Sequence, residues 1–160
     1  MPHYAHTKQD HTPESWEPLE DHLKLVAKYC LEFATIIQAG ECGRVLGMWH
    51  DLGKYSREFQ AYLHRQNGYE AHLEQYVGRV DHSTAGAQLA DRLFQNHPYG
   101  RMLAYSIAGH HAGLADVVSQ SGASGLDQRL KKPLPRTDDA PPELLQKPDL
   151  PKAPPIALAS

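Results

Sequence analysis

Histidine and acidic residues gather in four short clusters, and this pattern constrains the fold more than any other feature of the sequence. The clusters lie about thirty residues apart: Glu20-Asp21-His22, His50-Asp51, Asp81-His82 and His110-His111. This spacing fits one cluster for each helix or helix pair, with side chains that converge in the core of a bundle. Of the eleven histidines, six lack such placement and are predicted to be ordinary polar residues: His3, His6, His11, His64, His72 and His97.

The periodicity of apolar residues predicts helices between the clusters. From about residue 16 to residue 38, apolar residues recur at three and four residue steps, as in an amphipathic helix. Further helices are predicted over 42–51 and 56–65, from a cap at Asp81 or Ser83 to residue 93, and from residue 98 towards Gly109. Strand signals are scarce. We therefore expect residues 1–130 to form one all-α domain, a helical bundle.

The composition changes after residue 130, because eight of the twelve prolines lie from Pro133 onward. Residues 131–160 are therefore predicted to be a Pro-rich linker or tail, and its truncation is an open alternative. No apolar run approaches the length of a membrane span, and the first residues lack the pattern of a signal peptide, so we expect a cytoplasmic protein. Cys30 and Cys42 are too few for a disulfide framework and are predicted to be reduced.

The mixture of imidazole and carboxylate in the clusters indicates a metal site suited to phosphodiester hydrolysis. Imidazole suits Mn, Fe, Co, Ni or Zn, whereas a carboxylate has two oxygens and can bridge two ions. Asp51 is the predicted bridge. Two ions can position a water and stabilise the leaving oxygen, so no nucleophilic side chain is required. A formal charge of -3 argues against a broad basic surface, but bound cations would favour a phosphate locally.

Local geometry restricts where these ligands can lie. Successive residues on a helix point about 100° apart, so His50 and Asp51 can reach one site only near a helix end. Gly53 is predicted to supply that end, and Gly109 and Gly113 to permit the same at His110-His111. Lys54 follows Asp51 by three residues and is placed to contact a substrate phosphate as a point charge.

Four segments together resemble a known family. His50-Asp51-Leu52-Gly53-Lys54 looks like the signature of the HD superfamily. The opening segment Trp16–Leu23, the segment Asp81–Ala87 (HSxxGA) and the segment Gly109–Leu114 (GHHAGL) are similar to those of the HD nuclease domain of the CRISPR-associated helicase-nuclease of type I systems. The resemblance covers roughly residues 3 to 115 and implies an HD-domain helical bundle with a metal-dependent nuclease activity.

The resemblance also implies ligands, a substrate and partners. One divalent ion would be held by His22, His50 and Asp51, and the other by Asp51, His82, His110 and His111. Lys54 would assist at the phosphate of a single-stranded DNA that a type I CRISPR surveillance complex displaces. A helicase domain would lie on the same chain or on another. The family adds a late aspartate ligand, and the acids available, Asp138, Asp139 and Asp149, lie in proline-rich sequence.

Other interpretations of the same residues remain open at this stage. A nucleotide or cyclic-nucleotide phosphohydrolase also uses an HD site, and a catalytically inactive docking module would keep the helical fold alone. A further alternative is that His50 and Asp51 are only a helix-end pair, with Asp51 and Lys54 forming a surface ion pair worth under about 1 kcal/mol. Ser83 is predicted to cap a helix or to bond to a metal ligand, and not to act as a nucleophile.

Overall fold

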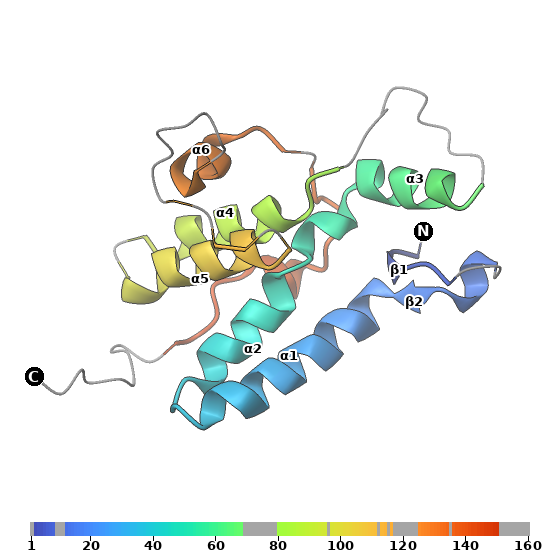
Figure 1. The fold of residues 1–160 in the computed structure, drawn as a ribbon. Helices are drawn as coiled ribbons and strands as arrows, with labels where there is room; N and C mark the ends of the chain where they lie inside the picture. Colours follow the sequence, from blue (N-terminus) through green and yellow to red (C-terminus); the bar gives the residue numbers. More distant parts are fainter. Residues whose placement is uncertain are drawn as a thin grey trace, which may run out of the picture.

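Two pairs of packed helices form the centre of the protein in the computed structural model (Figure 1). The structure describes residues 2–8, 12–68, 80–95, 97–111, 113–114, 116, 125–134 and 136–150. The first pair is α1 (Leu19–Thr35) and α2 (Gly40–Trp49), and the second is α4 (Ser83–Leu93) and α5 (Pro98–Gly109). These four helices and α3, described next, confirm the five predicted helical regions, with bounds that shift by at most a few residues.

Shorter elements surround the two pairs. The 3-10 helix η2 (Leu52–Tyr55) continues from α2 into α3 (Arg57–Gln66), and α6 (Leu126–Lys131) lies against α4. Two further 3-10 helices are η1 (Pro13–Ser15) and η3 (Pro142–Leu145). The sequence predicted α3 but not α6, because six residues are too few to display a helical period. Among the described residues, no helix has the length and apolar character needed to cross a membrane.

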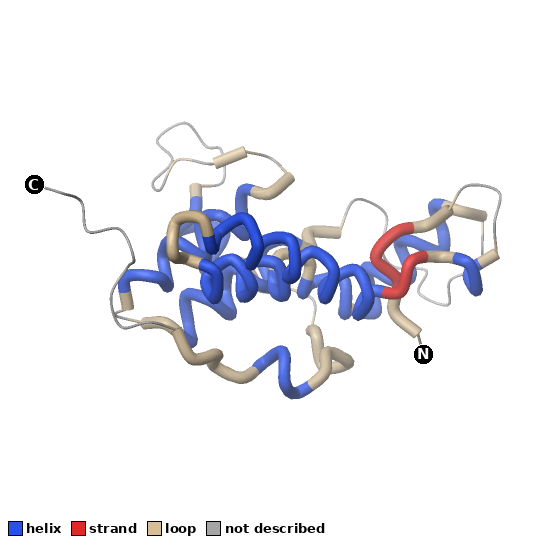
Figure 2. Tube along the Cα trace, turned by 90° about the horizontal axis from the view of Figure 1, so that it is seen from below, coloured by secondary structure: helices blue, strands red, loops and turns tan. Residues whose placement is uncertain are grey.

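A two-stranded antiparallel sheet corrects the expectation of an all-α fold. Strand β1 (Tyr4–His6) pairs with β2 (Glu17–Pro18), so that Tyr4 faces Pro18 and His6 faces Glu17 (Figure 2). The fold is therefore mostly helical with a small sheet at one end. Strands of three and two residues carry no alternating pattern, which is why the sequence did not reveal them. The sheet places the N-terminal segment beside the start of α1.

The core lies between the two helical pairs. Apolar side chains from α1, α2, α4 and α5 fill it, and they include Leu23, Trp49, Leu103 and Ile107, none more than 2% exposed. The helix α2 approaches α1 closely, because a Cβ on Gly43 would overlap the carbonyl oxygen of Cys30. The core therefore holds α2, and with it the residues that follow α2, in a fixed position.

Part of the proline-rich segment packs on this core. Ala140, Leu144 and Leu150 are buried in it, and the indole Nε1 of Trp49 donates a hydrogen bond to the Leu144 carbonyl at 2.8 Å. Residues 136–150 therefore contact the helices through these three side chains, while much of the segment stays exposed. The predicted division of the chain near residue 130 stays a prediction, and residues 151–160 lie outside the described residues.

Candidate metal centre

The end of α2 turns two neighbouring side chains towards the same point. The helix ends at Trp49, and His50 and Asp51 follow in a turn before η2 begins. The His50 Nδ1 lies 2.7 Å from the Gly47 carbonyl oxygen and donates to it, which fixes the orientation of the ring. His110 stands at the same place after α5 and bonds the Ile107 carbonyl at 2.7 Å. The prediction that both dipeptides lie at helix ends is confirmed.

Gly53 acts through close approach and not by ending α2. It lies inside η2, where its N–H donates to the His82 carbonyl at 3.1 Å, and a Cβ there would overlap that oxygen. Likewise a Cβ on Gly86 would overlap the carbonyl oxygen of Trp49. The two glycines let the start of α4 touch the backbone that carries Asp51, and this contact places His82 in the site.

Asp51 is the buried centre of the group, with 3% of its side chain exposed. Its Oδ2 lies 2.8 Å from Lys54 Nζ, 3.1 Å from His50 Nε2 and 3.3 Å from His22 Nε2. The Nε2 atoms of His22 and His50 are themselves 3.2 Å apart. One carboxylate oxygen therefore faces residues from α1, from the end of α2 and from η2.

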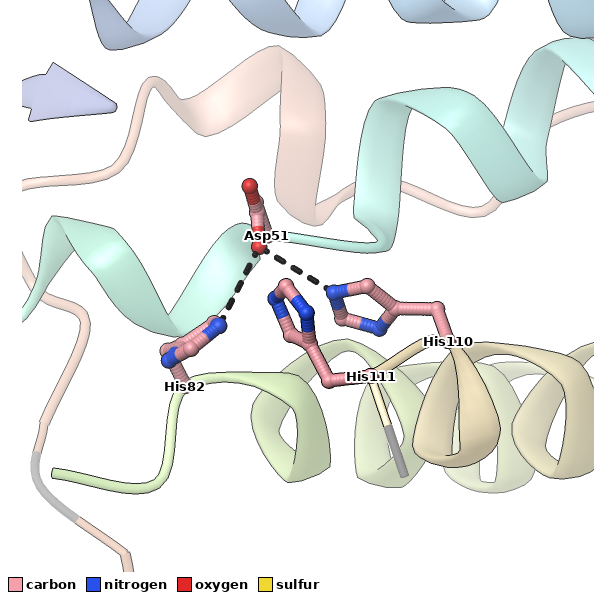
Figure 3. Close-up of side chains that lie close together, drawn as sticks. All are labelled: Asp51, His82, His110 and His111. Carbon is pink, nitrogen blue, oxygen red and sulfur yellow. Dashed lines mark ion pairs between the residues drawn. The ribbon is translucent and has the colours of Figure 1, made fainter. Parts of the chain in front are cut away.

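The other oxygen of Asp51 faces the second helical pair (Figure 3). Oδ1 lies 3.3 Å from His110 Nε2 and 3.5 Å from His82 Nε2. The His111 ring lies beside both imidazoles, with ring centroids 4.1 Å from His110 and 4.9 Å from His82. Asp51 and these three histidines have ligand atoms within 4.8 Å of one another. The start of α4 and the end of α5 thus meet at this oxygen.

The Nδ1 hydrogen bonds of the imidazoles turn Nε2 towards Asp51. A neutral imidazole that donates from Nδ1 carries a lone pair on Nε2, and the Nδ1 atoms of His50, His110 and His82 all face backbone carbonyl oxygens. Their Nε2 lone pairs then point at carboxylate oxygens, a contact that is favourable only with a proton or a metal ion between the two atoms. Fixing a ligand through its second nitrogen is typical of metal sites.

Distances and unpartnered atoms agree with such a cation. Two ligand atoms each about 2.1 Å from one ion, at tetrahedral or right angles, lie about 3.0 to 3.4 Å apart. The separations between the Asp51 oxygens and the histidine Nε2 atoms run from 3.1 to 3.5 Å. Three buried atoms, Asp51 Oδ1, His82 Nε2 and His110 Nε2, have no hydrogen-bond partner among the described residues. The residues fit a divalent ion of the kind that imidazole and carboxylate bind.

The electrostatic balance favours a charged Asp51. Burial by itself raises the pKa of its carboxyl group, but in the metal-free site the imidazoles of His110, His22 and His50 stabilise the carboxylate more than burial opposes it when a proton lies on Nε2. The pKa of Asp51 is therefore held well below its usual range. A permanently ionised carboxylate is the form that binds a metal.

The surroundings shift the pKa values of His82 and His22 in opposite directions. Burial lowers the pKa of His82 to about 4, against the attraction of Asp51, so this imidazole is neutral near pH 7. The bond to Asp51 is the largest influence on His22 and raises its pKa, although burial opposes this and Glu17 adds to it. A neutral His82 suits a metal ligand, whereas His22 would have to release the Nε2 proton that faces Asp51 before it could bind a metal.

Lys54 is buried beside Asp51 and does not reach the surface. Its side chain is 3% exposed, and its ammonium also donates to the Ala5 carbonyl at 3.0 Å. The Asp51–Lys54 ion pair is therefore real, but the interpretation of it as a surface pair is wrong. The predicted contact of Lys54 with a substrate phosphate stays a prediction.

Arg129 holds the two histidine-bearing helix ends together. Its guanidinium donates to Ser83 Oγ at 2.8 Å, to Thr84 Oγ1 at 2.9 Å and to the Ala108 carbonyl at 2.7 Å. Asp81 accepts a hydrogen bond from the Thr84 backbone N–H at 3.2 Å, so Asp81 and not Ser83 caps α4. Ser83 bonds Arg129 and touches no metal-ligand side chain in these contacts. No sequence pattern pointed to Arg129, which lies in the unpredicted α6.

Most histidines outside the clusters serve other contacts. His3 pairs with Asp139 at 3.5 Å, and His97 caps α5 by accepting from the Tyr99 backbone. His64 packs on Trp16. His11 and His72 lie outside the described residues. His6 is the exception, because its ring nitrogen lies within 4.8 Å of ligand atoms of His22 and Asp51, close enough for the three to hold a metal ion. His6 lies in a three-residue strand, where no helical periodicity could indicate its position, so the sequence analysis did not predict it as a site residue.

The late aspartate ligand is not found among the described residues. Asp139 pairs with His3 and with Arg57, each at 3.5 Å, and Asp138 pairs with Arg136 at 3.0 Å. Neither belongs to the two groups that have metal-binding geometry. The structure does bring together all the residues predicted as ligands: His22, His50, Asp51, His82, His110 and His111.

Helices whose ends gather imidazoles around one buried aspartate define a metal-dependent hydrolase domain of the HD type. The comparison with protein families makes this specific: the family model described as "Cas3, HD domain" matches residues 5–147. The chain belongs to the Cas3 HD domain family and is a metal-dependent nuclease domain of a CRISPR nuclease. No curated protein matches it.

Proposed function

We propose that this domain hydrolyses phosphodiester bonds of single-stranded DNA during CRISPR interference and antiviral defence. The observation that carries the proposal is the position of Asp51, whose two oxygens face different sets of histidines. A carboxylate in that position is suited to bridge two cations. The family assignment favours a nuclease over a nucleotide or cyclic-nucleotide phosphohydrolase.

In this proposal, His22, His50 and Asp51 hold one divalent transition-metal ion, and Asp51, His82, His110 and His111 hold the other. The ions would be Mn, Fe, Co or Ni, because both imidazole and carboxylate are suitable ligands for them. When bound, they polarise the phosphodiester and lower the pKa of the attacking water. The role of the Lys54 ammonium is to neutralise and orient the Asp51 carboxylate, in addition to the predicted contact with phosphate.

Each histidine contributes a fixed direction as well as a ligand atom. The carbonyls that accept from His50 and His110, both at 2.7 Å, hold these rings with Nε2 towards Asp51 before any ligand arrives. Such preorganisation lowers the cost of assembling the site around a scissile phosphate. His111 is exposed, so it marks the side from which a DNA strand would approach.

We further propose the cellular setting from the family. The domain would act in the cytoplasm on a strand exposed by a type I CRISPR surveillance complex, together with a helicase domain on the same or another chain. The sequence contains no phosphate-binding loop that would drive strand separation. We therefore expect this domain to require a strand that is already single.

The test uses the purified protein loaded with Mn and offered circular single-stranded DNA, the matching duplex, and nucleotides in separate reactions. We expect the single strand to be cut without ATP, the duplex to be largely spared, and EDTA to stop the reaction. Duplex cleavage at the same rate would refute the strand preference. Hydrolysis of nucleotides with intact DNA would establish the alternative function.

A further inference from the structure

His6 lies beside the metal centre although it is far from the other histidines in sequence. The β1–β2 pairing sets it opposite Glu17, and its ring stands edge-on to that of His22, with centroids 4.7 Å apart. Ligand atoms of His6, His22 and Asp51 lie within 4.8 Å of one another. The strand pairing therefore delivers a third imidazole to the Oδ2 side of Asp51.

Glu17 orients both imidazoles in the same way. Its Oε2 lies 2.7 Å from His6 Nδ1, and its Oε1 lies 3.3 Å from His22 Nδ1. When both Nδ1 atoms donate to this carboxylate, both Nε2 atoms carry lone pairs. A carboxylate behind the histidine is a frequent partner of metal ligands and fixes their tautomer. One acidic side chain thus prepares two ligand atoms.

His6 Nε2 and Asp51 Oδ2 both face a cationic group in the structure. The Lys54 ammonium lies 2.8 Å from Asp51 Oδ2 and 3.5 Å from His6 Nε2, so these two groups already face one positive charge. His6 Nε2 therefore has the acceptor character that a metal ligand needs. The neutral, Nδ1-protonated tautomer of His6 is consistent with both contacts.

We propose that His6 is a ligand of the metal ion on the Oδ2 side of Asp51, with Glu17 as the carboxylate that orients His6 and His22. This proposal rests on the proposed function, since it assumes a metal centre at Asp51. His6 supplies a coordinating atom on the side where no late aspartate is found among the described residues. The ligand set on that side becomes His6, His22, His50 and Asp51.

The two sides of the centre then differ in affinity. The His6 side chain is 54% exposed and stands on a short strand, whereas His82 and His110 are 12% and 18% exposed on packed helices. The ion at His6 also meets the positive charge of Lys54. It therefore binds more weakly and exchanges faster than the ion at His82, His110 and His111.

Metal content after equilibrium dialysis against Mn tests the proposal, with thermal unfolding as a second readout. We compare wild type with His6→Ala, Glu17→Gln and the control His97→Asn, which removes an imidazole but keeps a polar cap on α5. We expect His6→Ala to hold one ion fewer than wild type. Glu17→Gln keeps both ligands and should weaken Mn binding on that side by about 10–100-fold. His97→Asn should match wild type.

The outcomes separate the two proposals. A wild type that binds no Mn would refute the metal centre, and His6 with it. Equal Mn content and affinity in wild type and His6→Ala would overturn the His6 assignment alone and leave His6 as a partner of Glu17 and Lys54. If His6→Ala were poorly folded, Glu17→Gln would decide, because unchanged Mn affinity in that variant contradicts the orienting role.

Discussion

Replacement of Asp51 by asparagine tests the centre most directly, because it removes one charge and almost no volume. The side chains of Asp51 and Lys54 are each 3% exposed and 2.8 Å apart, so the substitution leaves a buried ammonium without its anionic partner. Breaking a buried ion pair on one side costs about 3–5 kcal/mol. The amide oxygen still accepts from Lys54, so we expect the free energy of unfolding to fall by about 3 kcal/mol, at the low end of this range.

That loss has a measurable size in a thermal unfolding curve of the metal-free protein. For a chain of this length, each kcal/mol shifts the melting temperature by about 2–4 °C, so Asp51→Asn should melt about 6–12 °C below wild type. Mn at 100 times its dissociation constant should stabilise wild type by about 2.7 kcal/mol and leave the variant almost unchanged. Nearly all nuclease activity should be lost as well.

The control is Asp91→Asn on the outer face of α4. Asp91 is 38% exposed and lies 3.7 Å from Arg101, so its charge contributes less than about 1 kcal/mol. This variant should retain the wild-type melting temperature and Mn response. If Asp51→Asn behaved like Asp91→Asn in both measurements, the assignment of Asp51 as the central metal ligand would be wrong.

Three further predictions follow from the same contacts. Because the folded state lowers the pKa of His82 to about 4 while the unfolded state keeps it near 6.5, the unfolded state binds more protons between these values, and stability is lost as pH falls from 6.5 to 4. Urea unfolding of the metal-free protein should show this loss. Between pH 6.5 and 4, the free energy of unfolding of His82→Gln should fall by about 3 kcal/mol less than that of wild type. Arg129→Ala should weaken Mn binding by about 10–100-fold in calorimetric titration, Arg129→Lys should restore only part of it, and the exposed Arg44→Ala should have no effect. Gly86→Ala should destabilise the fold by about 3 kcal/mol in chemical unfolding, because its Cβ would overlap the Trp49 carbonyl; wild-type stability would refute the close approach.

The sequence predicted the long helices and which histidines meet at Asp51, while the role of these residues as ligands stays a prediction. His50-Asp51 and His110-His111 were recognisable because neighbouring ligands can converge only where a helix ends, and the structure places both there. The role of Gly53 was not predictable in the same way. Its close contact with His82 joins residues 29 positions apart, and only the folded chain shows which backbones meet.

The rest of the centre came from short elements that carry no periodic signal. His6 reaches the site through a pairing of two strands with three and two residues, and Arg129 reaches it from a six-residue helix. The burial of Ala140 and Leu144 against the core was hidden for a similar reason, because a proline-rich composition resembles that of a solvated linker. Interactions between distant short segments are decided by packing and not by local pattern.

The arrangement around Asp51 couples metal binding to folding. Asp51 Oδ1, His82 Nε2 and His110 Nε2 are buried without hydrogen-bond partners among the described residues, and each such atom costs roughly 1–3 kcal/mol while it stays unpaired. Packing of α4 against the α2 end maintains this arrangement at the expense of stability in the metal-free protein. A bound cation satisfies all three atoms together and recovers that free energy. The same contacts that make the site less stable without metal would then make a bound ion stabilise the fold.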